Sequence, residues 1–252
     1  MTPSFPKFEV CLQSVDGALA AVRGGADRVE LCAALVEGGI TPSLGMVQAC
    51  RDAIDIDIMV MIRPRGGDFD YTERELDVMA QDIRNLRGIG VTGVVFGMLE
   101  HDGKVARPQV QRLVEEAGND LAVCFHRAFD VALDPFMALE TLIELGVDRV
   151  LTSGQAATVP EGMQVLKQLV EQSAGRIGIL PGCGILPENI ARVIAATGVK
   201  EFHATAFDTQ TSRMQHQNPA VYMGIPGLPE YERQVTSEAV VRQFVLAAGQ
   251  NQ

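Results

Sequence analysis

The chain has 252 residues, 47% of them hydrophobic, and its 32 acidic residues outnumber 21 basic ones, which gives a formal net charge of −11. A chain of this length and composition can bury a large core, and no apolar stretch is long enough to predict a membrane span. The acidic balance, without a basic run, disfavours nucleic acid as a partner.

Short strand-like segments alternate with amphipathic helical segments along the chain. The predicted strands span residues 8–11, 28–31, 58–62, 93–96, 121–126, 149–151, 176–180 and 200–203. The predicted helices span residues 14–23, 44–53, 72–87, 108–116, 135–145, 160–172, 187–196 and 236–248. Eight strand–helix pairs in a chain of this length match a single (β/α)8 TIM barrel better than an open doubly wound sheet.

The segment 205–235 interrupts this alternation and contains Pro219, Pro226 and Pro229. We expect a long loop after the eighth strand, acting as a lid, an interface arm or a packed irregular segment. No linker divides the chain, so residues 1–252 are predicted to form one domain.

The five cysteines are odd in number and have no CxxC spacing. This usage argues against a disulfide framework or a zinc ribbon and predicts reduced thiols. The N-terminus also lacks the pattern of a secretory signal, so we expect a cytoplasmic protein. We interpret Cys50 and Cys124 as small core residues, because free cysteine is commonly buried.

A Glu-x-Cys pattern occurs in both of the first two predicted strands, as Glu9 with Cys11 and Glu30 with Cys32. Side chains alternate along a strand, so each Glu shares a face with its Cys, while apolar residues occupy the other face. In a barrel the apolar face packs beneath the helices. The four polar residues are therefore predicted to point inward.

The same alternation places other polar side chains inside the barrel or at its mouth. These are Arg63, Cys124, His126, Glu201 and His203. Polar and Gly-rich segments follow the strand ends, where TIM barrels carry their chemistry. They are "RPRGGDFDYT" at 63–72, "HRAFD" at 126–130, "TSGQ" at 152–155 and "PGCGI" at 181–185.

Two sets of candidate residues emerge from these positions. The acid, base or other catalytic candidates are Glu9, Glu30, His126, Asp130 and His203. The candidates for binding an anion are Arg63, Arg65, Asp68, Arg127, Ser153, Gly154, Gly182 and Gly184. Structural alternatives remain open: the glutamates can pair with Arg28 or Arg63, the arginines can form a salt-bridged turn, and the glycines can form tight turns.

The sequence resembles the copper homeostasis protein CutC family over residues 8 to about 207. The strings that carry the resemblance are "EVC", "GGADRVELCAALVEGGITPSLG", "MIRPRGGDF", "FHRAFD", "RVLTSGQ", "PGCGI" and "EFHATA". The resemblance implies a cytoplasmic TIM barrel that forms a homodimer or a higher homo-oligomer. It also implies a role in copper tolerance with copper(I) bound by Cys11 and Cys32.

Two functions stay open at this point. The first is copper(I) binding, because copper(I) is a soft ion that prefers thiolate ligands. His203 is a candidate third ligand, since its strand adjoins the first strand. His126 lies across the barrel and is a poor candidate for the same ion. The second is an enzyme that acts on a small anionic metabolite by acid–base chemistry, which fits the arginines and Gly-rich turns at the mouth. A phosphorylated metabolite is one such substrate.

Overall fold

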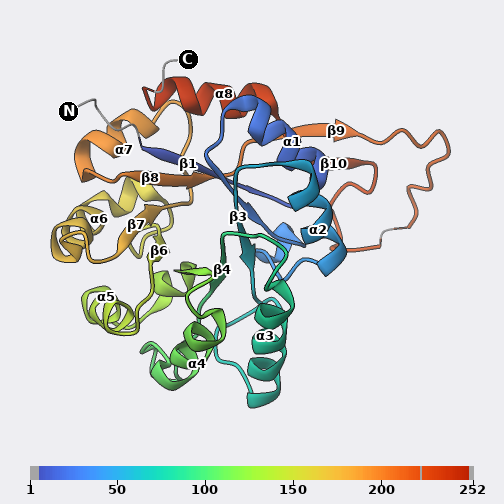
Figure 1. The fold of residues 1–252 in the computed structure, drawn as a ribbon. Helices are drawn as coiled ribbons and strands as arrows, with labels where there is room; N and C mark the ends of the chain where they lie inside the picture. The colour runs from blue at the N-terminus through green and yellow to red at the C-terminus, as the bar shows by residue number, and fades with distance from the viewer. Residues whose placement is uncertain (1–5, 222, 250–252) are drawn as a thin grey trace.

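Eight parallel strands form the centre of the computed structural model, which describes residues 6–221 and 223–249, and helices surround them (Figure 1). The barrel strands are β1 (Lys7–Leu12), β2 (Arg28–Leu31), β3 (Asp57–Met61), β4 (Gly93–Phe96), β5 (Ala122–Phe125), β6 (Arg149–Thr152), β7 (Gly178–Pro181) and β8 (Glu201–Ala204). The helices are α1 (Val15–Gly24), α2 (Leu44–Ala53), α3 (Glu73–Leu86), α4 (Arg107–Ala117), α5 (Pro135–Glu144), α6 (Val159–Ser173), α7 (Ile190–Thr197) and α8 (Glu238–Ala247). Within the described residues, no helix has the length and hydropathy needed to cross a membrane.

The strands pair in the order β7-β6-β5-β4-β3-β2-β1-β8, and every pair is parallel. A parallel bridge between Gly182 and His203 joins the two ends of this order. The barrel is therefore nearly closed, and the predicted (β/α)8 architecture is confirmed. Each predicted strand boundary lies within about two residues of the observed one.

Two separate cores confirm the predicted alternation of strand side chains. Phe8, Val10, Val29 and Leu31 belong to the larger core, between the strands and the surrounding helices. A smaller cluster fills the barrel interior and consists of Cys11, Cys32, Met59, Met61, Val95, Cys124, Leu151 and Leu180. The polar residues predicted to point inward are thus placed within or next to this interior cluster.

Local signals explain most helix boundaries. Thr72 and Glu75 form a capping box at the start of α3, and Asp134 caps α5. Helix α7 begins at Ile190, three residues later than predicted, because the Asn189 side chain is used in a turn. Its Oδ1 accepts the Leu186 N–H at 2.9 Å, and its Nδ2 donates to the Gly184 carbonyl at 2.9 Å.

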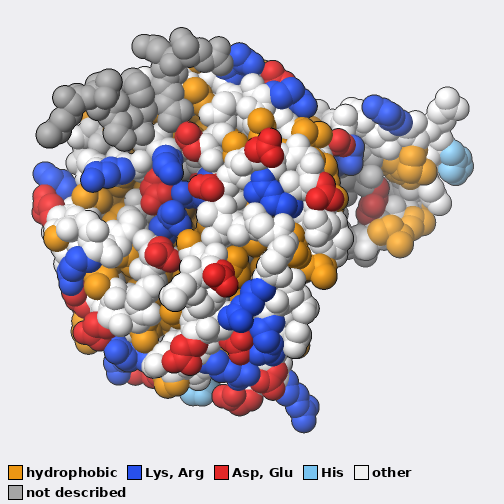
Figure 2. Space-filling model, in the orientation of Figure 1, with side chains coloured by type: hydrophobic (Ala, Val, Ile, Leu, Met, Phe, Trp, Pro, Cys, Tyr) orange, Lys and Arg blue, Asp and Glu red, His pale blue; other side chains and the backbone are white. Residues whose placement is uncertain are grey.

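The segment after β8 differs from the expected loop because it contains an antiparallel pair of strands, β9 (Phe207–Thr211) and β10 (Glu232–Thr236). Most residues of both strands are exposed, so no alternation of buried and exposed side chains marked them in the sequence. The pair and the chain between its strands extend away from the barrel as an arm (Figure 1). Hydrophobic side chains gather on this arm (Figure 2); the large exposed ones are Met214, Val221, Met223, Ile225 and Leu228.

An aromatic cluster on the outer face joins the first strand to the last. The Phe8 ring stacks on Phe202 of β8, with centroids 4.5 Å apart, and lies 5.0 Å from Phe244 of α8.

We expect Phe8→Ala to lower the free energy of unfolding by about 3–5 kcal/mol, because it leaves a cavity where the barrel closes. Urea denaturation measures the change. Leu246→Ala, at an exposed position of α8, should lower the free energy of unfolding by less than about 1 kcal/mol. Equal decreases in both variants would contradict the role of Phe8 in closing the barrel.

Candidate functional site

Two thiols and a carboxyl group meet inside the barrel, where β1 lies beside β2. Cys11 is paired in register with Glu30, and Cys32 follows the end of β2. The Cys11 sulfur lies 3.9 Å from the Cys32 sulfur, and it shares a hydrogen bond of 3.2 Å with Glu30 Oε2. Cys32 donates to the same oxygen at 3.5 Å. All three side chains are buried.

The loop after β2 covers Cys32. Gly39 has a φ of 88°, and a Cβ at this position would lie 3.1 Å from the Cys32 sulfur. Glycine is therefore favoured here both by the left-handed backbone and by the close approach to sulfur. The Gly-Gly pair of the "ALVEGGI" string thus helps to bury Cys32.

His203 links the two inward glutamates. It is paired in register with Glu9, and its Nδ1 lies 2.7 Å from Glu9 Oε1. Its Nε2 lies 3.9 Å from Glu30 Oε2. The structure therefore brings together Glu9, Glu30 and His203, three of the residues that the sequence offered as catalytic candidates.

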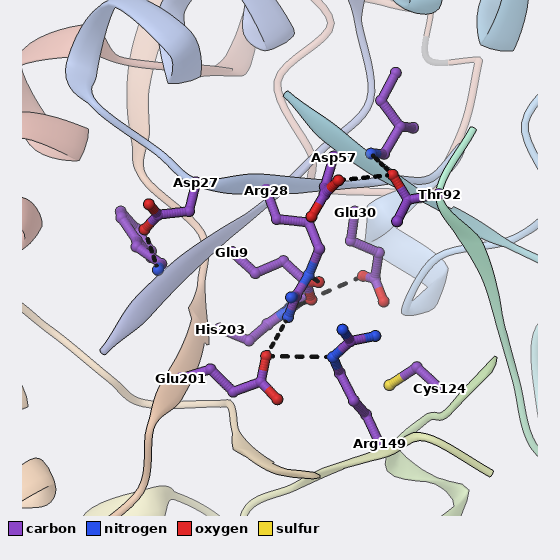
Figure 3. Close-up of polar contacts among 12 residues, drawn as sticks. Glu9, Asp27, Arg28, Glu30, Asp57, Thr92, Cys124, Arg149, Glu201 and His203 are labelled. Carbon is purple, nitrogen blue, oxygen red and sulfur yellow. Dashed lines mark hydrogen bonds and ion pairs between the residues drawn. The ribbon is translucent and has the colours of Figure 1, made fainter. Parts of the chain in front are cut away.

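An ion-pair network continues from Glu9 through Arg28 and Glu201 to Arg149 (Figure 3). Arg28 donates from Nε to Glu9 and from Nη2 to Glu201 Oε2, the latter at 2.6 Å. Arg149 Nε lies 3.3 Å from the same Glu201 oxygen. Of the two arginines suggested as partners for Glu9, Arg28 is thus the one that forms the pair.

These contacts form one connected set, which we call the interior polar chain. In order of contact, it runs through Arg149, Glu201, Arg28, Glu9, His203, Glu30, Cys11 and Cys32. Arg149 was not among the predicted inward residues, although its position in the strand indicates an inward side chain. Arg149 has the same strand parity as Leu151, which lies in the interior cluster.

The two glutamates differ in their protonation. Burial raises the pKa of Glu9, but the charges of Arg28 and His203 outweigh it and hold the pKa at about 2. For Glu30, burial is also the largest influence, and the neighbouring Cys11 thiolate adds to it, so its pKa lies well above the usual value. Burial lowers the pKa of His203, but Glu30, Cys11 and Glu9 together raise it well above its usual value. Glu9 is therefore a fixed carboxylate, and Glu30 is the carboxyl group that can carry a proton.

The two thiols differ in the same way. The pKa of Cys11 is influenced most by its hydrogen bond with Cys32, which lowers it. Burial raises this pKa, but the hydrogen bond and the nearby His203 outweigh burial, and the pKa of Cys11 falls to about 5. The same hydrogen bond, with burial, raises the pKa of Cys32 well above its usual value. Cys11 is thus the thiolate of the pair, and Cys32 holds the remaining proton.

A pocket of about 230 Å³ opens at the barrel mouth beside this cluster. Its lining residues are Cys11, Glu30, Glu37, Gly38, Met61, Arg63, Phe69, His126, Arg127, Leu151 and His203. It brings together candidates from both of the predicted sets. Glu37 and Phe69 were missed by the sequence analysis because they lie in loops, where no strand parity applies.

His126 is buried in the wall of this pocket. Its Nδ1 accepts the Ala128 N–H at 3.1 Å, and its ring lies 4.9 Å from the Phe69 ring. Burial and the nearby Arg63 charge lower the pKa of His126 to about 3. The imidazole is therefore neutral at physiological pH.

Arg63 joins the loops that follow β2 and β3. Nη1 donates to the carbonyls of Glu37 and Gly39 at 2.9 and 3.1 Å, and Nη2 donates to the Gly67 carbonyl at 2.8 Å. Its guanidinium also lies over the Phe69 ring, 5.1 Å from the centroid. Arg63 thus shapes the pocket mouth while its side chain stays buried.

Four other predicted polar residues lie outside the pocket lining: Arg65, Asp68, Asp130 and Ser153. Asp130 accepts from Thr152 Oγ1 at 2.5 Å and from the Ser153 N–H at 3.0 Å, and it pairs with Arg127 at 2.7 Å. Arg65 forms surface ion pairs of 3.0 Å with Asp68 and 2.6 Å with Glu75. These contacts connect the loops of the mouth to one another.

The predicted glycines also lie outside the pocket lining. A Cβ on Gly154 would lie 2.4 Å from the Gly162 carbonyl oxygen, so glycine here allows the loop after β6 to approach α6. Gly182 and Gly184 lie in the turn after β7. The structure therefore does not bring these glycines together with Arg63 and His126.

A cavity of about 590 Å³ lies along the arm and is lined by Asp16 and residues 210–214 and 230–233. It contains none of the predicted site residues. We therefore place the candidate site at the barrel mouth, where buried polar groups are concentrated.

The family model described as "CutC family" matches residues 6–208, which include all eight barrel strands. The chain belongs to the CutC family. The CutC family protein of Bacteroides thetaiotaomicron is 49% identical over 233 residues, covering 92% of this chain and 93% of its own. The human relative, named "Copper homeostasis protein cutC homolog", is 46% identical over 236 residues, covering 93% of this chain and 86% of its own.

Solved structures agree with this assignment. The crystal structure of CutC from Streptococcus agalactiae superposes with a TM-score of 0.76 at 32% identity and covers 79% of this chain and 98% of its own. Phosphoribosylanthranilate isomerase from Thermotoga maritima has a TM-score of 0.56 at 12% identity, with coverage of 98% and 100%. The second likeness shows the barrel fold alone.

The contacts of the interior polar chain predict that removing the Arg28 side chain lowers the free energy of unfolding strongly. We expect Arg28→Met to lower the free energy of unfolding by about 3–5 kcal/mol, because Glu9 and Glu201 lose a buried cationic partner. Adding Glu9→Gln should restore part of this loss, since one buried charge is removed. Urea denaturation measures both variants. Arg107→Met, which breaks an exposed pair with Glu144, should cost less than about 1 kcal/mol; a similar cost for Arg28→Met would contradict the prediction.

Proposed function

We propose that this protein binds copper(I) through Cys11 and Cys32 and acts in copper homeostasis in the cytoplasm. The observation that carries the proposal is the pair of buried sulfur atoms 3.9 Å apart at the end of the interior polar chain. The printed name of the human relative refers to copper homeostasis. The names of the curated relatives above state no enzymatic activity, so the alternative of a metabolite-converting enzyme is not favoured.

The donor set fits a soft ion. Copper(I) prefers thiolate ligands, and metal–thiolate bonds are about 2.3 Å in zinc sites, so two such bonds span at most about 4.6 Å. The sulfur separation of 3.9 Å fits a bent arrangement of two thiolates around one ion. Glu30 completes a group of three donor atoms that lie within 4.8 Å of one another.

His203 belongs to a second, overlapping group with Glu9 and Glu30. The sequence offered His203 as a candidate third copper ligand. In the structure, the residue whose donor atom lies within 4.8 Å of both sulfur atoms in such a group is Glu30. In our proposal, Cys11 supplies a thiolate that is already ionised, and Cys32 releases its proton when copper(I) binds. His203, held by Glu9, positions Glu30 beside the sulfur atoms.

The state of the cysteines supports a cytoplasmic location. All five cysteines are free, including the neighbouring pair Cys11 and Cys32. Adjacent thiols persist in a reducing compartment, whereas an oxidising one favours disulfides.

We further propose that the protein forms a homodimer or higher homo-oligomer through the arm. The arm extends from the barrel and exposes Met214, Val221, Met223, Ile225 and Leu228 (Figure 2). Exposed apolar side chains grouped in this way are typical of an interface, and a second copy of this chain is the partner that we propose.

Copper(I) titration against a chromogenic chelator under anaerobic conditions tests the proposed metal site. We expect one tightly bound ion per wild-type chain and loss of this ion in the Cys11→Ser/Cys32→Ser variant. Cys183→Ser is the matched control, because this half-buried thiol lies outside the group of donors and should leave binding unchanged. Equal stoichiometry in the double variant and the wild type would rule the site out.

Light scattering coupled to size-exclusion chromatography tests the proposed interface. We expect the wild type to have at least twice the chain mass, and Met223→Asp/Ile225→Asp to have the mass of one chain. Val78→Asp, which adds one acidic group at an exposed position of α3, should leave the mass unchanged. A monomeric wild type, or an arm variant of unaltered mass, would contradict the proposal.

A further inference from the structure

We infer that the pocket at the barrel mouth binds the carboxylate of a small hydroxy or keto acid, between His126 and Arg63 on one side and Glu30 on the other. This site adjoins the proposed copper(I) site and shares Cys11 and Glu30 with it, whereas His126 and Arg63 belong to the pocket alone. Three observations on the pocket lining carry the inference.

The first observation is an unused hydrogen-bond donor on His126. Its Nδ1 accepts the Ala128 N–H, so in the neutral ring the proton is on Nε2. Nε2 is buried and has no hydrogen-bond partner among the described residues. A buried N–H group without an acceptor is unfavourable, so an oxygen atom of a ligand in the pocket would satisfy it.

The second observation is the charge of Arg63. Its side chain is 5% exposed, and it forms no ion pair with any carboxylate in the described part of the chain. Its guanidinium donates hydrogen bonds to three backbone carbonyls and lies over the Phe69 ring. A buried cation without a counter-ion is costly, and an anion in the pocket would compensate it. Arg127, at the rim, adds a second positive charge, part of which Asp130 neutralises.

The third observation concerns the opposite wall. Glu30 Oε2 contacts both thiols, whereas its buried Oε1 has no partner among the described residues. A hydroxyl group, or the hydrated form of a keto group, placed beside the ligand's carboxylate would pair with this oxygen. The pocket therefore offers a place for an anionic oxygen at one wall and for a neutral polar group at the other.

The lining of the pocket favours a carboxylate over a phosphate. A volume of about 230 Å³ lies below the range of roughly 300–1,000 Å³ of pockets that hold larger ligands, which suits a short-chain acid. Barrels usually hold phosphate with backbone N–H groups of Gly-rich loops and a helix N-terminus. Here Gly154, Gly182 and Gly184 do not line the pocket.

Isothermal titration calorimetry of the metal-free protein with L-lactate, pyruvate and inorganic phosphate tests the inference. We expect at least one of the two acids to bind and phosphate not to bind. His126→Asn should weaken acid binding at least tenfold, because Asn can still cap the Ala128 N–H but is too short to replace Nε2. Arg63→Met should abolish binding, and Arg63→Lys, which keeps the charge, should retain part of it if the methionine variant does not fold.

Two controls separate this site from the copper(I) site and from general charge effects. His126 lines the pocket but is not among the proposed copper(I) donors, so His126→Asn should lose acid binding and keep copper(I) binding. Arg107→Met, at an exposed position of α4, should also bind the acid normally. The inference is overturned if neither acid binds the wild type at millimolar concentration, if phosphate alone binds, or if His126→Asn binds the acid as tightly as the wild type.

Discussion

The pairing of Arg28 with Glu9 and Glu201 inside the barrel is the constraint on which the site depends. Three charged groups buried together tolerate little movement, because each loses its compensation when a partner shifts. Glu9, held by Arg28, in turn holds His203 through Nδ1, and His203 faces Glu30 with Nε2. Glu30 then contacts both thiols. The position of the sulfur atoms thus follows from an ion pair deeper in the barrel.

This arrangement also gives chemically identical side chains different protonation. Burial favours the protonated form of both glutamates, but the charges of Arg28 and His203 keep the pKa of Glu9 low, whereas burial and then the nearby Cys11 raise the pKa of Glu30. Cys11 and Cys32 divide in the same manner through their shared hydrogen bond. The barrel mouth therefore joins two kinds of donor group. Sulfur atoms suited to a soft metal ion lie on one side, and the N–H and cationic groups of His126 and Arg63, suited to an anionic oxygen, lie on the other.

The loops around the mouth show which features could be predicted from local sequence and which could not. Strand parity identified Glu9, Cys11, Glu30 and His203 as inward residues, because alternation along a strand is a local property. The contacts of Asp130 with Thr152 and Ser153 were not predictable, since they join loops from different βα units. The exposed arm strands β9 and β10 were missed for another reason. Their pairing rests on backbone hydrogen bonds, without a buried face that leaves a hydrophobic pattern.

The sequence alone determined the barrel, its strand order in space and the family. The hydrophobic period, the helix caps and the long motif strings are all properties of short stretches of sequence. It also identified Glu9, Cys11, Glu30, Cys32 and His203 as interior residues, although Arg149 was not among them. Tertiary structure decided how those side chains combine: Arg28 and not Arg63 pairs with Glu9, Glu30 and not His203 is grouped with both thiols, and Gly154 packs against α6 outside the pocket. These choices depend on the stagger of neighbouring strands and on loop conformation. Distances of a few ångströms between side chains on different strands are set only when the barrel closes.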